Sequence, residues 1–195
     1  PRLWLTAADL PRLRSWAVDS NPFWKNGLKV AAAAGKQVMD NGSVPGSDPG
    51  HPGATQHPTE MYAQIFAFMS LVHPQQSVRD DYGQRARTLL MAVMNEAAKG
   101  AGSGRFRAAT FSTYDRSRWH GEAFPLVVDW IYPRLSASDK ATIRKVFERW
   151  VDENMNANTT GHNHPTLVGL TNDPKLVSDT RAVRWSAHNY YTAHM

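Results

Sequence analysis

The chain has 195 residues, of which 42% are hydrophobic, and this predicts one globular domain with a buried core rather than two domains. It contains no cysteine, which excludes disulfides, thiolate nucleophiles and thiolate metal ligands. Its 22 basic and 17 acidic residues give a formal net charge of +5, spread along the sequence, which permits a polyanionic partner without demanding one. No stretch of about 18 or more apolar residues occurs, so we expect no membrane partner.

The first part of the chain predicts a helix hairpin over about residues 7–41. Thr6 with Asp9 resembles a capping box, and the apolar residues that follow at helical spacing predict a helix to about residue 18. Asn21-Pro22 then supplies an N-cap and a proline at the first helical position, which predicts a second helix to about residue 38.

A second hairpin is predicted over about residues 59–99. Residues 42–57 hold four glycines and three prolines and predict a loop. The helix from Thr59 to about residue 72 is apolar nearly all round, so we expect it to be deeply buried. Ser77 with Asp80 predicts the cap of the next helix, which ends near Lys99-Gly100.

A third hairpin is predicted over about residues 119–155. Apolar residues on one face predict a helix from Trp119 to Leu135, closed by Pro133. Ser136 with Asp139 predicts the start of a helix that runs to about Met155.

The remainder of the chain is polar and irregular over residues 156–184, and a further helix is predicted to begin at about residues 186–195. No segment shows the alternation of a strand, so the fold class is all-α, one α-helical domain over residues 1–195. Helix hairpins separated by Gly/Pro-rich loops can bury a common core by lying side by side. Because the sequence stops inside its next helix, we expect it to be a fragment of a larger protein.

The last residues gather side chains that move protons near neutral pH or hold a carboxylate by hydrogen bonds. They are His188, Asn189, Tyr190, Tyr191 and His194. An ordinary helix end is the alternative interpretation.

Three segments resemble the helical domain of heparinase II/III-like and alginate-lyase-like polysaccharide lyases. Residues 2–13 resemble the start of that domain. Residues 123–136, with Asp129-Trp130-Ile131-Tyr132 before Leu135-Ser136, are similar to its "Asp-Trp-Leu-Tyr … Leu-Ser" helix hairpin. Residues 189–194 fit the place of its asparagine-centred active-site segment.

The resemblance implies an α/α toroid of helix hairpins, often followed by β-sandwich domains, in a secreted or periplasmic protein. It also implies cleavage of a uronic-acid polysaccharide by β-elimination, so the expected partner is an acidic polysaccharide or oligosaccharide. In this reaction an enzyme stabilises charge beside the uronate carboxylate, removes the C5 proton and protonates the departing O4, none of which requires a metal or another cofactor.

By the same resemblance Asn189 contacts the uronate carboxylate, with His188 or Tyr190 assisting, His194 as a further catalytic candidate and Tyr191 as a substrate contact. Related alginate lyases often carry Asn-Asn-His where this chain has His188-Asn189-Tyr190. The family's later tyrosine and histidine would lie beyond Met195. A cap role for Asn189 and an interhelical hydrogen bond for His194 are the structural alternatives.

A possible substrate wall lies at the start of the helix predicted from Trp119. Arg118, Trp119, His120 and Glu122 combine a helix N-terminus, which favours anions, with an aromatic ring that can face a sugar. The alternative is a capped helix with Trp119 in the core.

Other site signals are weak. His162 and His164 form an H-x-H pair without a third ligand at supporting spacing, so we expect no metal site. No phosphate loop, nucleophile elbow or nucleic-acid module is present, so no nucleic-acid partner is expected.

Two other functions compete with a lyase. A glycoside hydrolase on a similar toroid would need two facing carboxylates, and Asp115, Glu122 and Asp129 form no evident pair. A non-catalytic carbohydrate-binding or scaffold module is the third hypothesis.

Overall fold

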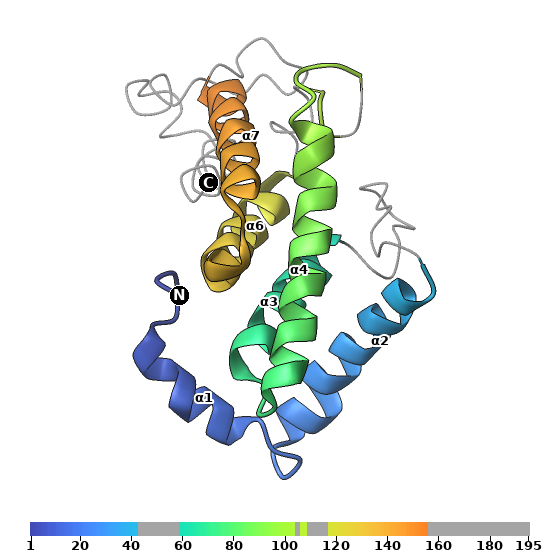
Figure 1. The fold of residues 1–195 in the computed structure, drawn as a ribbon, viewed down its shortest axis with the longest axis vertical. Helices are drawn as coiled ribbons and strands as arrows, with labels where there is room; N and C mark the ends of the chain where they lie inside the picture. Colours follow the sequence, from blue (N-terminus) through green and yellow to red (C-terminus); the bar gives the residue numbers. More distant parts are fainter. Residues whose placement is uncertain (43–58, 104–105, 109–116, 156–195) are drawn as a thin grey trace, which may run out of the picture. The chain divides into compact units, whose positions relative to one another are not determined.

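The computed structural model describes residues 1–42, 59–103, 106–108 and 117–155, with the backbone alone at 117–119 and 154–155. All regular structure in these ranges is helical, which confirms the all-α class for the part described (Figure 1). The elements are, in order, the 3-10 turn η1 (Ala7–Asp9), α1 (Leu10–Trp16), the π-helical turn η2 (Phe23–Leu28), α2 (Lys29–Asp40), α3 (Thr59–Val72), α4 (Gln76–Ala97), α6 (Ser117–Ile131), the 3-10 turn η3 (Tyr132–Arg134) and α7 (Ala137–Met155). The loop predicted over 42–57, apart from its first residue, and the helix predicted at 186–195 lie outside the described residues.

The chain divides into two compact units, and both units are discontinuous in sequence. The first unit comprises Pro1–Met91 and Leu126–Ser136. The second comprises Ala92–Pro125 and the chain from Ala137 onward. Helices α4 and α6 therefore each contribute residues to both units.

Local capping signals start the first two helical segments where the sequence predicts them. The Asp9 carboxylate accepts hydrogen bonds from the Thr6 N–H (2.9 Å) and hydroxyl (2.8 Å). These bonds, the backbone one first, hold the pKa of Asp9 below its ordinary value. Asn21 Oδ1 accepts from the Phe23 N–H at 3.1 Å, directly before the π-helical turn that leads into α2.

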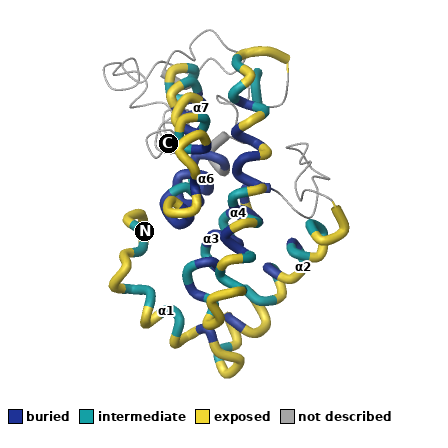
Figure 2. Tube along the Cα trace, in the orientation of Figure 1, coloured by how far each residue is buried: buried dark blue, intermediate teal, exposed yellow. Residues whose placement is uncertain are grey.

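Helix α3 lies at the core of the first unit. It coincides with the helix predicted from Thr59, and its predicted burial is confirmed by the dark blue of its tube in Figure 2. Its buried residues are Thr59, Glu60, Tyr62, Ala63, Phe66, Ala67, Met69, Ser70 and Val72. Helices α1 and α2 both contact α3. In one such contact, Arg14 Nε donates to the Leu71 carbonyl at 2.9 Å.

The contact between α2 and α3 depends on a glycine. Gly35 is buried in α2, and a Cβ at this position would overlap the Tyr62 ring and come within 2.9 Å of Phe66 Cζ. Tyr62 is itself only 4% exposed, so its ring has little room to move away. The close approach of the two helices therefore requires that position 35 carry no side chain.

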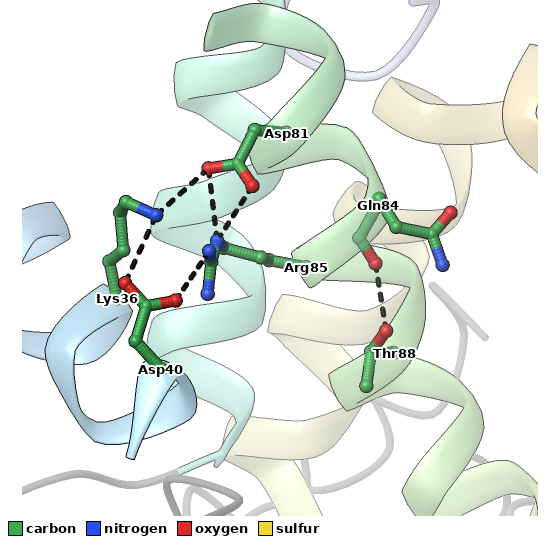
Figure 3. A network of polar contacts seen from close by, with 6 residues as sticks. All are labelled: Lys36, Asp40, Asp81, Gln84, Arg85 and Thr88. Carbon is green, nitrogen blue, oxygen red and sulfur yellow. Dashed lines mark hydrogen bonds and ion pairs between the residues drawn. The ribbon is translucent and has the colours of Figure 1, made fainter. Parts of the chain in front are cut away.

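A ring of four charged side chains joins α2 to α4 (Figure 3). Asp40 accepts from Lys36 (3.1 Å) and Arg85 (2.6 Å), and Asp81 pairs with the same Lys36 (3.5 Å) and Arg85 (3.0 Å). Hydrogen bonds from Arg85, and then from Lys36, hold the pKa of Asp40 below its ordinary value. Arg85 is the most covered member, with 15% of its side chain exposed.

The predicted cap of α4 is wrong. The helix begins at Gln76, and the Gln75 carbonyl accepts from the Arg79 N–H, so Ser77 lies inside the first turn. Asp80 does not complete a capping box, because its carboxylate accepts from Gln76 and, at 2.6 Å, from Arg134 after α6. Asp80, which the local spacing predicts as a capping residue, thus pairs with the distant Arg134 instead.

In the second unit, cations on α7 bind carbonyls at the end of α4 and in the segment after it. Arg149 donates to the Ala97 carbonyl and, at 2.6 Å, to that of Phe106, and Lys145 donates to Ala98 at 3.1 Å. A positive charge is favourable at a helix C-terminus, where carbonyls lack intrahelical partners. These bonds attach α7 to the end of α4.

Helix α6 ends earlier than the sequence predicts. The α-helix stops at Ile131 rather than Leu135, because residues Tyr132–Arg134 around Pro133 form a 3-10 turn. It also tolerates Pro125 in its interior, where the missing N–H removes one bond of the helix ladder. Helix α7 then begins at Ala137, directly after the predicted Ser136 cap position.

His73, directly after α3, lies beside two aromatic rings. Its ring centroid is 5.6 Å from that of Trp24 and 6.4 Å from that of Tyr82. Its Nδ1 accepts a hydrogen bond from the Gln75 N–H at 3.2 Å. Burial is the main cause that lowers the pKa of His73 below its ordinary value, and the charge of Arg79 contributes in the same direction.

Gly35→Ala should destabilise the protein by about 1–3 kcal/mol, because the new methyl group overpacks the Tyr62 and Phe66 rings. Urea unfolding measures this decrease in the free energy of unfolding. Gly27→Ala is the matched control: no atom lies within 4 Å of a Cβ there, so the helix-favouring alanine should leave stability unchanged or raise it. Equal stability of the Gly35 variant and the wild type would contradict the close approach.

Acidification should weaken the fold through His73. Because its folded-state pKa is lowered, the unfolded state binds the proton more readily. The stabilising contribution is complete above the ordinary pKa near 6.5 and is lost as the pH falls toward the folded-state value. Urea unfolding at about pH 7.5 and about pH 5.5 should therefore show a smaller difference for His73→Gln than for the wild type. Identical pH dependence in the two proteins would refute this assignment.

Candidate functional site

The catalytic residues predicted from the sequence lie outside the described residues. These are His188, Asn189, Tyr190 and His194, together with the substrate contact Tyr191. The same holds for the His162 and His164 pair. Their roles stay predictions.

The predicted substrate wall maps to the first turns of α6. Arg118 and Trp119 belong to the first turn, where the structure describes backbone alone, and Glu122 is partly buried. His120 is only 4% exposed, and its ring centroid lies 5.2 Å from that of Phe124 and 5.9 Å from that of Phe106. His120 thus packs in an aromatic cluster of the second unit, and its contact with a sugar stays a prediction.

A buried carboxylate in the first unit holds the start of the chain. Asp129, on the last turns of α6, is 8% exposed. Its Oδ2 accepts from the Arg2 N–H (2.5 Å) and the Leu3 N–H (2.9 Å), and its Oδ1 lies 3.6 Å from Arg2 Nε. Charge-assisted bonds of this kind satisfy a carboxylate that has lost its water.

The next residue completes the attachment. The Trp130 indole N–H donates to the Leu3 carbonyl at 3.2 Å, so both backbone polar groups of Leu3 are bound by neighbouring side chains of α6. The Trp130 ring also packs against Phe68 of α3, with 5.6 Å between centroids. We call Asp129 and Trp130, acting on Arg2 and Leu3, the N-terminal clamp.

Trp4, directly after the N-terminal clamp, has a strained backbone and an exposed side chain. The Leu5 N–H donates to the Leu3 carbonyl at 2.7 Å, and Trp4 between them has φ +62°. This is a three-residue γ-turn with a positive central φ, the rarer and more strained form. A bulky residue in such a conformation costs about 1–3 kcal/mol. The Trp4 residue is nevertheless 67% exposed.

Arg2 and Trp4 are surface residues that the sequence did not mark as a site. Both lie in the segment that resembles the lyases, yet neither shows a spacing that distinguishes a binding residue from any other surface residue. The one local signal is an arginine two positions from a tryptophan. The turn that exposes Trp4 depends on partners about 126 positions further along the chain.

The described residues offer no group of three or more histidine, aspartate and glutamate side chains that could hold a metal ion. None of the helices in this part of the chain is long and apolar enough to cross a membrane.

Comparisons with protein family models, with curated proteins and with solved structures found no match to this chain.

Asp129→Ala should lower the free energy of unfolding by about 2 kcal/mol, because two backbone N–H groups lose a charged acceptor. Hydrogen exchange at the Leu3 amide should accelerate at the same time. Trp130→Phe removes one hydrogen-bond donor and keeps an aromatic ring against Phe68. It should therefore lower the free energy of unfolding by less, about 1 kcal/mol.

Asp19→Ala is the matched control for the carboxylate. Asp19 forms an ion pair with Lys29, and its side chain is 62% exposed, so replacing it should change the free energy of unfolding little. If Asp129→Ala is no less stable than the Asp19 variant, the N-terminal clamp does not stabilise the fold.

Proposed function

We propose that the chain is the helical domain of a polysaccharide lyase, with an α/α toroid architecture, that cleaves a uronic-acid-containing polysaccharide by β-elimination. Its substrate is an acidic polysaccharide or oligosaccharide. The protein works outside the cytoplasm, secreted or in the periplasm, where such polymers occur.

The observation that carries this proposal is the N-terminal clamp. The resemblance to lyases was traced on separate segments, and two of them, residues 2–13 and 123–136, meet through the bonds from Arg2, Leu3 and Trp130. The residues that make the resemblance most specific, Asp129-Trp130, are the ones that bind the opening segment. The two segments that resemble the lyases are therefore bonded to each other in this fold. This contact supports a common architecture rather than a chance similarity of short sequence segments.

The helical content and the charge support the same proposal. All described regular structure is helical, as a toroid of helix hairpins requires. The formal net charge of +5 is compatible with a polyanionic substrate.

The proposed chemistry is carried by the C-terminal cluster. Asn189 donates an amide N–H to the uronate carboxylate as negative charge moves onto it in the transition state. Tyr190 and the histidines at 188 and 194 are the groups that remove the C5 proton and protonate the departing O4. When the base takes the C5 proton, the electron pair of that C–H bond forms the C4=C5 double bond as the C4–O4 bond breaks, and the acid gives a proton to O4.

An elimination assay tests the proposal. The full gene product that contains this chain should be incubated with alginate, heparan sulfate, hyaluronan and polygalacturonate. Elimination leaves an unsaturated uronate at the new non-reducing end, so ultraviolet absorbance should rise on at least one polymer. New reducing ends without this absorbance would mean hydrolysis, and no new ends on any polymer would leave a non-catalytic module; either result contradicts the lyase.

Asn189→Ala in the active protein should lower kcat by about 10²-fold to 10³-fold, because one donor to the developing charge is lost. Asn26→Ala, at an exposed position of the π-helical turn, is the matched control and should keep full activity. Circular dichroism should show the same helix content in both variants. Retained activity in the Asn189 variant would show that this residue does not stabilise the transition state.

A further inference from the structure

We propose that Arg2 and Trp4 form a surface subsite that binds one acidic sugar residue of a glycan chain, separate from the cluster around Asn189. The choice of an acidic glycan as ligand rests on the proposed function, whereas the subsite itself rests on the geometry of the N-terminal clamp.

The first argument is the conformation of Trp4. A γ-turn with φ +62° disfavours any residue with a Cβ, and glycine would adopt it without strain. The fold maintains this turn from both sides, through the N-terminal clamp before it and through the Thr6–Asp9 hydrogen bonds after it. Strain that the surroundings enforce in this way is a feature of ligand sites.

The second argument is the exposure of the Trp4 indole. Trp4 is 67% exposed, so its indole is not used for packing to the extent that Trp24 or Trp150 is, at 6% and 0%. An indole face binds the C–H face of a pyranose ring, because the ring's π-electrons attract polarised C–H groups. The strained turn thus places an aromatic surface in solvent.

The third argument is Arg2, a cation two positions before Trp4 in the sequence. The Arg2 side chain is 85% exposed, and the contact with Asp129 involves its Nε. The two terminal nitrogens of the guanidinium carry four N–H donors, in the fork geometry that binds a carboxylate by two parallel hydrogen bonds. Asp129 contacts both the backbone N–H and the Nε of Arg2. Because the Arg2 side chain is already restrained in this way, it loses less conformational entropy when a ligand binds.

The Arg2 guanidinium favours an anionic ligand, because its side chain is exposed and its contact with Asp129 is made through Nε. A uronate offers a carboxylate for Arg2 and a ring face for Trp4, whereas a neutral hexose offers only the second. The arrangement therefore selects an acidic sugar.

Affinity electrophoresis tests the subsite. Native gels should be cast with polygalacturonate, with alginate, or with neutral dextran, and the proteins should carry Asn189→Ala so that cleavage of the polymer during the run is slowed. The parent protein should be retarded by at least one acidic polymer and not by dextran. Trp4→Ala and Arg2→Gln should each weaken this retardation by about tenfold in dissociation constant.

Trp16→Ala is the matched control. Trp16 is also an exposed tryptophan with a nearby arginine, but the Arg12 guanidinium lies 4.7 Å from the centre of its ring and covers a face. Its replacement should leave retardation unchanged. An equal loss in the Trp16 variant, equal retardation by dextran, or unchanged retardation in the Trp4 variant would each overturn the subsite.

Trp4→Gly separates binding from folding. Glycine removes the strain at position 4, so the urea midpoint should rise while the retardation is lost. A lower midpoint would show that the indole stabilises the fold, and would overturn the proposal.

This test and the lyase assay can fail independently. If the protein produces no unsaturated uronate but Trp4→Ala still abolishes retardation, the subsite is supported and the proposed catalysis is wrong.

Discussion

The desolvation of one carboxylate determines how the first unit is assembled. Asp129 is almost fully buried at the end of α6, and an ionised carboxylate without water requires hydrogen-bond donors in place of it. The chain supplies two of these donors from the backbone of Arg2 and Leu3. Because backbone donors have little conformational freedom, the opening segment must run past α6 in one direction and at one register. The γ-turn with its exposed Trp4 begins at Leu3, the second of the two residues held in this way.

The sequence predicted those parts of the fold that depend on neighbours along the chain. Thr6 and Asn21 form the expected capping bonds, and the apolar run of α3 is buried as its composition implied. Prediction failed where a distant residue competes for a side chain: Asp80 binds Arg134 instead of capping α4. The end of α6 was also misplaced, because a 3-10 turn around Pro133 ends the α-helix at Ile131, before Leu135. Arg134, the partner of Asp80, is 54 positions away, which spacing along the helix does not reveal.

Of the two candidate sites, one could be predicted from the sequence and the other could not. Asn189 and its neighbours could be named because their residue types match an expected chemistry, and the sequence suffices for that. Arg2 and Trp4 could not be named as a pair, since neither the positive φ nor the exposure of an indole is encoded by adjacent residues. The bonds that hold the two residues before Trp4 come from Asp129 and Trp130, more than 120 positions away. A site produced by tertiary contacts becomes visible only with the fold.

The interleaved division of the chain has a consequence for how it emerges from the ribosome. The first unit requires Leu126–Ser136, which is synthesised only after residues 92–125 of the second unit have already been made. The buried partners of Arg2 and Leu3 are thus missing until most of the described chain exists, and domains otherwise tend to fold in order from the N-terminus. The opening segment cannot form these bonds earlier, and neither unit corresponds to a single stretch of the gene that could be exchanged or duplicated intact.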